Sequence, residues 1–295
     1  MDQTCLIAGA GYTALRLARR LQPRWRVVAL PRSEASATRL SAAGLEVLRA
    51  DLDGKLAPGA LSVADGAAIA YLVPPTESAD GDPRLAGFFG ALGEARPTAL
   101  LYLSTTGVYG DTGGEVVTED SPVVPLSDRG RRRAAAERIV SEWCSTRGVR
   151  RVLLRVPGIY GPGRLPLDRL RRGEPALRPE DSGPGNRIHV DDLVTACVAA
   201  LERPVRGIFN VTDGDHSSTT EFVQRTAALA GLPSPPLVAL AEARGRISPG
   251  MLSFLVESRR VDNRRMREEL GVEPRYASLD AGIAASLEEM GATKD

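Results

Sequence analysis

Thr4–Leu21, TCLIAGAGYTALRLARRL, reads as an apolar strand, then a glycine turn, then an amphipathic helix. Gly9 and Gly11 allow a tight turn and a close approach of the backbone to a pyrophosphate, and Ala14 lets the helix pack against the strand. The helix N-terminus offers unpaired N–H groups and a positive dipole end to an anion. The motif alone is weak, because small residues at such a turn also serve packing. Its place between a strand and a helix predicts a Rossmann-type dinucleotide site.

The end of the next predicted strand, Trp25–Leu30, indicates which dinucleotide is favoured. An acidic side chain there would accept hydrogen bonds from the adenosine ribose and favour NAD(H), but Pro31, Arg32 and Ser33 follow instead. Arg32 and Ser33 suit a 2′-phosphate, so we expect NADP(H) to be favoured over NAD(H). The alternative is that Arg32 is a solvated loop charge and Ser33 caps the next helix, since serine is a favoured N-cap. A single serine can do both.

Apolar and helical segments alternate along the chain. This alternation indicates right-handed βαβ units and a parallel sheet that binds ligands at the carboxyl ends of its strands. The expected fold class is therefore α/β, a Rossmann-type doubly wound parallel sheet with a smaller C-terminal substrate-binding part. Further strands are expected at Leu45–Leu48, Ala67–Val73, Thr98–Leu103, Val149–Val156 and Ile208–Val211, and helices at Glu34–Ala43, Asp82–Arg96, Thr219–Ala230 and Leu279–Met290.

We expect two structural parts. Residues 1–165 together with about 186–213 should form the NAD(P)-binding domain. A charged, irregular insertion ending at Gly185, about 166–185, and the stretch 214–295 should form the substrate-binding part.

The composition fits a soluble globular protein, with 43% hydrophobic residues, 25% charged residues and a net charge of +1. So small a net charge argues against a nucleic-acid partner. Cys5, Cys144 and Cys197 lie far apart without histidine partners, so neither a disulfide framework nor a metal site is indicated. There is no leader-like N-terminus and no apolar run of about 18 residues, so we expect a cytoplasmic protein without a membrane partner.

The segment Ser104–Asp111, STTGVYGD, places hydroxyl groups just past a strand end, where the nicotinamide ring is expected. It resembles the S-[ST]-x-x-V-Y-G motif of the extended short-chain dehydrogenase/reductase superfamily, the NAD-dependent epimerase/dehydratase group. Three later segments are similar to motifs of this family and follow in its order: Arg155–Arg164 (RVPGIYGPGR), Asn186–Asp192 (NRIHVDD) and Phe209–Asp213 (FNVTD).

On this resemblance, Thr105 matches the catalytic Ser/Thr that hydrogen-bonds the substrate oxygen, and Tyr109 matches the tyrosine of the V-Y-G turn. The family's Tyr-x-x-x-Lys pair falls where this chain has Arg129 and Arg133. Arginine stays protonated and has no acceptor, so Arg129 cannot pass a proton as tyrosine does. Arg133 could still donate to the nicotinamide ribose hydroxyls. The departure is similar to that of an atypical subgroup that lacks the pair.

Arg129 and Arg133 share a helix face with Glu137 and are expected to face the cleft, which would suit an anionic substrate. The alternative is that part of the run Arg129–Arg133 consists of solvated charges. Asp191 or Asp192 is expected to cap a helix running to Leu201. His189 is expected to make a local hydrogen bond rather than to bind a metal.

The expected site residues divide by role. Thr105, Arg129, Arg133 and Tyr109 are the catalytic candidates, with Tyr109 or Tyr160 expected to carry any proton. The resemblance places Tyr160, Arg164 and Arg187 near the substrate. The cofactor is expected to contact Gly9, Gly11, Tyr12, Thr13, Arg32, Ser33, Asp51, Leu52, Val73 and Pro74.

Two functions follow from these expectations. The first is an NAD(P)-dependent epimerase/dehydratase-like or reductase-like enzyme acting on a small anionic molecule, such as a sugar nucleotide, a phosphate or a carboxylate. The second is a catalytically silent dinucleotide-binding regulatory or partner-binding protein, which the loss of the tyrosine favours. Members of the superfamily often dimerise through helices that correspond to about 82–96 and 127–147, so a homodimer is also considered.

Overall fold

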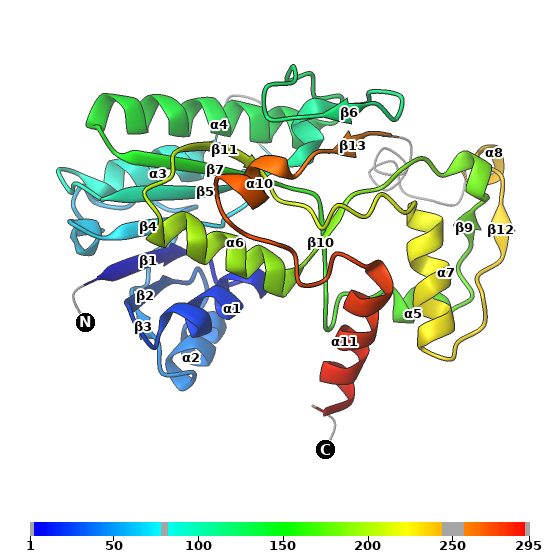
Figure 1. The fold of residues 1–295 in the computed structure, drawn as a ribbon. Coiled ribbons are helices and arrows are strands. Elements are labelled where there is room, and N and C mark those ends of the chain that lie inside the picture. The colour runs from blue at the N-terminus through cyan, green and yellow to red at the C-terminus, as the bar shows by residue number, and fades with distance from the viewer. Residues whose placement is uncertain (1–2, 78–81, 244–256, 293–295) are drawn as a thin grey trace.

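A computed structural model describes residues 3–77, 82–243 and 257–292. Its centre is a seven-stranded parallel sheet with the strand order β11-β7-β5-β4-β1-β2-β3 (Figure 1). The order reverses after β1, as in a doubly wound sheet. This confirms the predicted fold class. The strands are β1 (Thr4–Ala8), β2 (Arg26–Leu30), β3 (Glu46–Val47), β4 (Ala68–Tyr71), β5 (Ala99–Thr105), β7 (Arg150–Val156) and β11 (Gly207–Asn210).

Helices cover both faces of the sheet, because side chains alternate between the faces along each strand. On one face, Ile7 belongs to the buried cluster formed with α1 and α6, and on the other Leu6 belongs to the cluster formed with α3 and α4. Figure 1 shows these two helical layers on opposite sides of the sheet. The helices are α1 (Tyr12–Leu21), α2 (Glu34–Ala42), α3 (Pro83–Leu92), α4 (Asp128–Arg147) and α6 (Val190–Glu202).

Most of the remaining elements lie beyond the carboxyl ends of β5 and β7, and all of them except β6 come from the second half of the chain. Parallel two-residue or three-residue pairs join β8 to β10, β9 to β12 and β6 to β13. Figure 1 shows α5, α7, β9 and β12 gathered away from β1–β3. These elements are β6 (Val116–Val117), β8 (Gly158–Tyr160), β9 (Ala176–Leu177), β10 (Arg187–His189), β12 (Leu237–Val238), β13 (Arg260–Val261), α5 (Leu167–Arg171), α7 (Thr219–Leu229), α8 (Leu240–Ala243), α10 (Arg264–Glu268) and α11 (Leu279–Ala292).

One helix from the C-terminal stretch packs on the sheet itself. Met266 of α10, with Leu270 and Val272 after it, is buried in the same cluster as Ile7. The core of the sheet is therefore completed by residues that lie more than 50 positions after its last strand in the sequence.

Several predicted elements differ from the observed ones at their ends. The helix predicted to run to Arg96 ends at Leu92, because Gly93 adopts a left-handed conformation with φ +56°. The predicted insertion before Gly185 contains α5 and β9 and is not wholly irregular. The three cysteines are buried and unbridged, as expected. None of the described helices is both long enough and apolar enough to cross a membrane.

Candidate functional site

The glycine turn lies at the carboxyl end of β1. Gly9 has a φ of +112° and donates its N–H to the carbonyl of Leu30 at the end of β2. Gly11 is the residue before α1, and a Cβ atom placed there would meet nothing within 4 Å. The N-terminus of α1 therefore faces open space next to a backbone that carries no side chain. This is the local geometry that an anion-binding turn requires.

The side chains of the first two residues of α1, Tyr12 and Thr13, have different environments. Thr13 is buried, whereas the Tyr12 hydroxyl donates to the carbonyl of Pro162 at 2.9 Å. The guanidinium of Arg164 lies over the Tyr12 ring, 4.1 Å from its centroid. Tyr12 thus connects the glycine turn to the segment that follows β8 on the substrate side.

Arg32 and Ser33 follow β2 at the expected adenosine end. The Arg32 side chain is 70% exposed, and its Nη1 lies 3.2 Å from Asp53 Oδ2. The Ser33 hydroxyl accepts the Ser36 N–H and caps α2, so the capping alternative is confirmed. A further arginine, Arg39 of α2, donates to the carbonyl of Ala10 within the glycine turn.

The other expected cofactor contacts surround the same edge of the sheet. Val73 lies against Gly9, with 3.6 Å between its Cγ2 and a Cβ built on Gly9. Asp51 Oδ1 accepts the N–H of Asp53 and shapes the turn there, and Leu52 is buried. The Pro74 carbonyl accepts from Arg84 at 3.4 Å. Of these residues, Val73 lies directly against the glycine turn.

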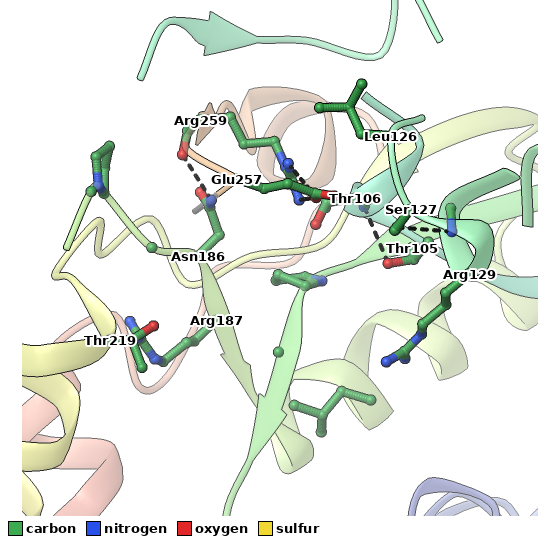
Figure 2. Close-up of a pocket in the computed structure, with 18 of the residues that line it drawn as sticks. Thr105, Thr106, Leu126, Ser127, Arg129, Asn186, Arg187, Thr219, Glu257 and Arg259 are labelled. Atoms are coloured by element: carbon green, nitrogen blue, oxygen red, sulfur yellow. Dashed lines mark hydrogen bonds and ion pairs between the residues drawn. The ribbon is translucent and has the colours of Figure 1, made fainter. Parts of the chain in front are cut away.

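A cavity of about 840 Å³ opens beyond the carboxyl ends of β5 and β7 (Figure 2). Its described lining combines the turn after β5, the N-terminal part of α4 and segments around β8 and β10. Six arginines line it, against two acidic residues, so the cavity carries an excess of positive charge. The charged lining residues are Arg129, Arg131, Arg132, Arg164, Arg187, Arg259, Asp128 and Glu257.

Thr105 and Arg129 both face this cavity (Figure 2). Thr105 Oγ1 accepts the N–H of Gly107 at 3.2 Å, so its O–H proton can be donated elsewhere. Arg129 makes no hydrogen bond or ion pair to any residue within the described ranges. Burial lowers its pKa, and the neighbouring charges of Arg133 and Arg132 lower it further. Its guanidinium is an unpaired cation available to an anionic ligand.

Arg133 lies behind the cavity and not in its described lining. Its Nη1 donates to the Leu103 carbonyl at 2.7 Å and to the Tyr102 hydroxyl at 2.9 Å. A longer contact of 3.4 Å joins the same nitrogen to the carbonyl of Val73. Arg133 therefore holds α4 against the carboxyl ends of β4 and β5. Both arginines were expected to face the cleft. Arg129 lines the cavity, whereas Arg133 does not belong to its described lining.

Neither tyrosine expected to carry a proton belongs to the described lining of the cavity. The Tyr109 hydroxyl donates to Asn210 Oδ1 at 2.7 Å, because the turn over Thr106–Tyr109 directs the ring into a buried cluster. The Tyr160 ring packs edge-on against His189 in a second buried cluster. Burial raises the pKa of both hydroxyls. This placement corrects the expectation that one of them faces the substrate.

Arg164 and Arg187 do line the cavity, as the resemblance implied. Arg187 is 7% exposed, and its Nη1 donates to the Ser217 carbonyl at 2.6 Å and its Nη2 to Thr219 Oγ1 at 3.3 Å. Its position is therefore fixed by α7 and the loop before it. Burial lowers its pKa, which the charge of Asp213 partly offsets.

The sequence reasoning missed one charged pair in the cavity wall. Arg259 donates to Glu257 Oε2 at 3.0 Å, and Asn186 donates to the Arg259 carbonyl (Figure 2). The pair reaches the cavity because β13 adds to β6, which lies near the turn after β5. No local pattern around Ser258 indicates that β13 pairs with β6, because the two strands lie about 140 residues apart in the sequence.

A buried ion pair supports the wall from behind. Arg155 of β7 donates to both carboxylate oxygens of Glu137 in α4, at 3.1 and 2.8 Å. Ser104 of β5 donates to the same carboxylate at 2.5 Å. Both charged side chains are less than 10% exposed. Three elements of the site are thereby fixed to one another. Removing one partner would leave a buried charge uncompensated.

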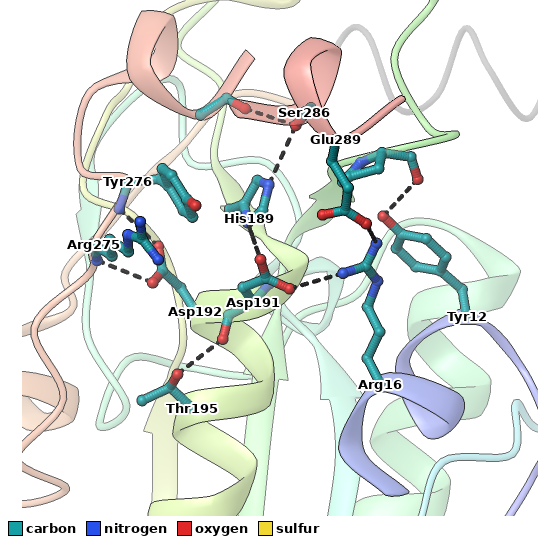
Figure 3. Close-up of polar contacts among 12 residues, drawn as sticks. Tyr12, Arg16, His189, Asp191, Asp192, Thr195, Arg275, Tyr276, Ser286 and Glu289 are labelled. Carbon is teal, nitrogen blue, oxygen red and sulfur yellow. Dashed lines mark hydrogen bonds and ion pairs between the residues drawn. The ribbon is translucent and has the colours of Figure 1, made fainter. Parts of the chain in front are cut away.

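The segment around β10 contacts α11 and the loop before it (Figure 3). His189, and neither aspartate, caps α6: its Nδ1 accepts the N–H of Asp191 at 3.2 Å. Asp192 instead accepts the backbone N–H groups of Arg275 and Tyr276. This corrects the predicted cap, while the expected local hydrogen bond of His189 is confirmed. Within residues 3–77, 82–243 and 257–292, no cluster of His, Cys, Asp and Glu could hold a metal ion.

A seven-stranded parallel sheet with a glycine turn after β1 is a Rossmann-type architecture, and a cavity opens beside the turn after β5. Residues 88–212 match the model of the NAD dependent epimerase/dehydratase family.

One curated relative and two solved structures show how the similarity is distributed. The chain is 31% identical over 186 residues to 3-diazoavenalumate denitrifying reductase from Streptomyces sp. The aligned region covers 58% of this chain and 59% of that protein. A functionally unknown conserved protein from Silicibacter pomeroyi DSS is 32% identical, with a TM-score of 0.79 and complete coverage of both chains. UDP-glucose 4-epimerase from Thermus thermophilus has a TM-score of 0.79 at 22% identity and covers 98% of this chain and 99% of that one.

The curated relatives match over part of their length only. The chain spans 50–59% of the first three of them.

We expect Gly130→Ala to destabilise the protein by about 1–3 kcal/mol, because the new methyl group overpacks the joint between α4 and the turn after β5. A Cβ atom at Gly130 would lie 2.7 Å from the Gly107 carbonyl oxygen and 2.9 Å from Pro125 Cβ. Gly87→Ala in α3 is the matched control, since a Cβ there meets nothing within 4 Å. The control should gain roughly 0.5–1 kcal/mol from helix propensity. Urea unfolding of both variants tests this, and equal effects would contradict it.

We expect Asp213→Asn to stabilise the protein increasingly as the pH rises from about 4 to 8. Burial, together with the charges of Asp215 and Asp192, raises the pKa of Asp213 to about 8, and its Oδ2 has no hydrogen-bond partner among the described residues. The folded state therefore keeps a proton that the unfolded state releases, so the wild type loses stability through this window. The gain should reach on the order of 1–4 kcal/mol at pH 8. Urea unfolding at pH 5 and 8 measures it, and a difference independent of pH would contradict the assignment.

Proposed function

We propose that this protein binds NADP(H) along the carboxyl edge of the sheet and acts on a small anionic molecule in the arginine-lined cavity. The observation that carries the proposal is the excess of arginine in a cavity that begins directly beyond β5. Anionic groups such as phosphates and carboxylates bind guanidinium groups through charge-assisted hydrogen bonds. The Thermus thermophilus structure is a UDP-glucose 4-epimerase complex with NAD, which supports a nicotinamide dinucleotide in the corresponding place.

The proposed roles follow from the positions of the side chains. A bound nicotinamide would supply or accept a hydride, and the protein would supply binding and orientation. Thr105 would donate its O–H to a substrate oxygen, because that proton is not used within the described structure. Arg129, whose guanidinium has no partner among the described residues, would bind negative charge present on the substrate or developing during the reaction. Arg187 and Arg164 would hold a second anionic group.

The cofactor-binding part in this proposal comprises residues 1–165 and about 186–213, and the remainder contributes the substrate side. A cytoplasmic location and a homodimer through α3 and α4 belong to the same proposal. Sedimentation of the purified protein tests the dimer directly.

A second candidate is a dinucleotide-binding protein without catalytic activity. The observation that favours it is the absence of tyrosine from the described lining, together with the burial of Tyr109 against Asn210. Arg129 cannot replace the missing proton carrier. In this case cofactor binding would regulate the association of the protein with a partner.

The two candidate functions predict different results in a substrate-turnover assay. Purified protein should be incubated with NADP+ or NADPH and with UDP-glucose, UDP-glucuronic acid or a simple carboxylate, while absorbance at the reduced-nicotinamide band is followed. Turnover of any of these supports the enzyme. Tight NADP(H) binding without turnover across the whole panel favours the silent binder.

We expect wild-type protein to bind NADP+ more tightly than NAD+, and Arg32→Ala to lose that preference. An arginine–phosphate contact contributes on the order of 1.5–3 kcal/mol, or about ten- to a hundredfold in affinity. Arg24→Ala is a control, because Arg24 is an exposed arginine near the other end of β2 that pairs with Glu202. Calorimetric titration with both dinucleotides measures the effect. Equal wild-type affinities for NADP+ and NAD+ would refute the preference.

A further inference from the structure

The arginine that we assign to the 2′-phosphate is already engaged by a carboxylate. Asp53 Oδ2 lies 3.2 Å from Arg32 Nη1. Arg84 binds the same carboxylate through two nitrogens, with Nε contacting Oδ1 and Nη2 donating to Oδ2 at 2.9 Å. Asp53 is thus shared between an exposed arginine, Arg32, and a largely buried one, Arg84, whose side chain is 19% exposed.

The two arginines hold this carboxylate unequally. The pKa of Asp53 is lowered chiefly by the hydrogen bond from Arg84 and then by that from Arg32, so the group stays ionised at neutral pH. Arg84 also donates to the Pro74 carbonyl, which fixes it to the loop after β4. Asp53 therefore stays in place when Arg32 moves, because Arg84 still binds it by two contacts.

We propose that Asp53 is a specificity-determining residue that limits how strongly the protein prefers NADP(H) to NAD(H). This inference rests on the proposed function. A 2′-phosphate must take Arg32 from Asp53, so its binding is weakened by the free energy needed to break the existing Arg32–Asp53 ion pair. NAD(H) carries no such phosphate and does not meet this competition. Asp53 therefore lowers the affinity for one dinucleotide and leaves that for the other unchanged.

The competing role for Asp53 gives the opposite result. A carboxylate at the adenosine end can accept hydrogen bonds from ribose hydroxyls, which is how acidic residues favour NAD(H) in related sites. In that role Asp53 would strengthen NAD(H) binding directly, without acting through Arg32. The two roles are separated by measuring both dinucleotides on the same variant.

The experiment is calorimetric titration of NADP+ and NAD+ into wild type, Asp53→Asn, Arg32→Ala and the double variant. We expect Asp53→Asn to bind NADP+ about two- to fivefold more tightly, because Arg32 no longer has to leave an exposed ion pair, with no gain in NAD+ affinity. The gain should vanish in the Arg32→Ala background, because Asp53 acts through Arg32. Glu46→Gln is the matched control: Glu46 pairs with Arg26 between β2 and β3, at the opposite end of β2.

Three results would overturn the inference while leaving the proposed function standing. These are an unchanged NADP+ to NAD+ ratio in Asp53→Asn, a loss of NAD+ affinity in that variant, or a gain that persists without Arg32. If wild-type protein binds neither dinucleotide, or binds both equally, the proposed cofactor preference fails first. Circular dichroism and a thermal melt establish that each variant is folded before titration.

Discussion

Replacement of Gly11 by valine is expected to abolish dinucleotide binding while the fold survives. A Cβ atom at Gly11 meets no protein atom within 4 Å, so the isopropyl group fits the unliganded protein. The space that it fills is where the backbone must approach the pyrophosphate. We expect the affinity for NADP+ to fall by more than about a hundredfold, which corresponds to roughly 2.7 kcal/mol. The melting temperature should fall by only a few degrees, because valine is a poorer N-cap than glycine by about 1 kcal/mol.

Gly9→Ala provides the contrast to Gly11→Val. Gly9 has a φ of +112°, a conformation that an L side chain adopts only with strain. Its replacement should therefore lower the free energy of unfolding as well as cofactor affinity. Calorimetry beside a thermal melt separates the two glycines. Retained NADP+ binding by a folded Gly11→Val protein would show that the phosphate lies elsewhere.

Substitutions of Arg129 are expected to weaken anion binding, less when only the planar fork is lost and more when the positive charge is removed. We expect Arg129→Lys to weaken binding of UDP-glucuronic acid about fivefold, because it keeps the charge but not the planar fork. Arg129→Ala and Arg129→Tyr should each weaken it about ten- to a hundredfold, since both remove the cation. Arg138→Ala is the control, because Arg138 is exposed on the same helix and does not line the cavity.

The tyrosine variant also distinguishes the two candidate functions. Arg129→Tyr restores the residue type that the family uses for proton transfer, at the start of α4. Wild-type activity that is lost in Arg129→Tyr supports a catalytic centre built around the arginine. Robust epimerase or dehydrogenase activity in Arg129→Tyr, absent from the wild type, would contradict that centre and identify a disabled enzyme. Titration and absorbance assays on the same preparations give both readouts.

The parts of the fold that depend on local pattern could be predicted from the sequence. The glycine turn, the alternation of strands and helices, and the positions of Thr105 and Arg129 follow from short-range periodicity and motif spacing. The parallel sheet follows from that alternation, since right-handed βαβ units permit few other arrangements. These features were therefore predictable to within a few residues at their ends.

Features that depend on tertiary contacts could not be predicted in this way. The Tyr109 hydroxyl donates to Asn210, about 100 residues away, a partner that the motif containing the tyrosine does not indicate. Asp192 looks like a helix cap in the sequence, but its carboxylate satisfies backbone N–H groups of a distant loop. The Arg259–Glu257 pair enters the cavity wall only because β13 pairs with β6. Local propensity carries no information about such partners.

The packing of α10 bears on how this architecture can be divided. Met266, Leu270 and Val272 fill the same buried cluster as the side chains of β1 and α1. A chain cut after Asp213 would leave that apolar surface open to water, although every strand of the sheet precedes the cut. A C-terminal stretch that replaces the present one must therefore supply equivalent apolar side chains. The packing of the sheet's core therefore restricts which C-terminal stretches can replace the present one.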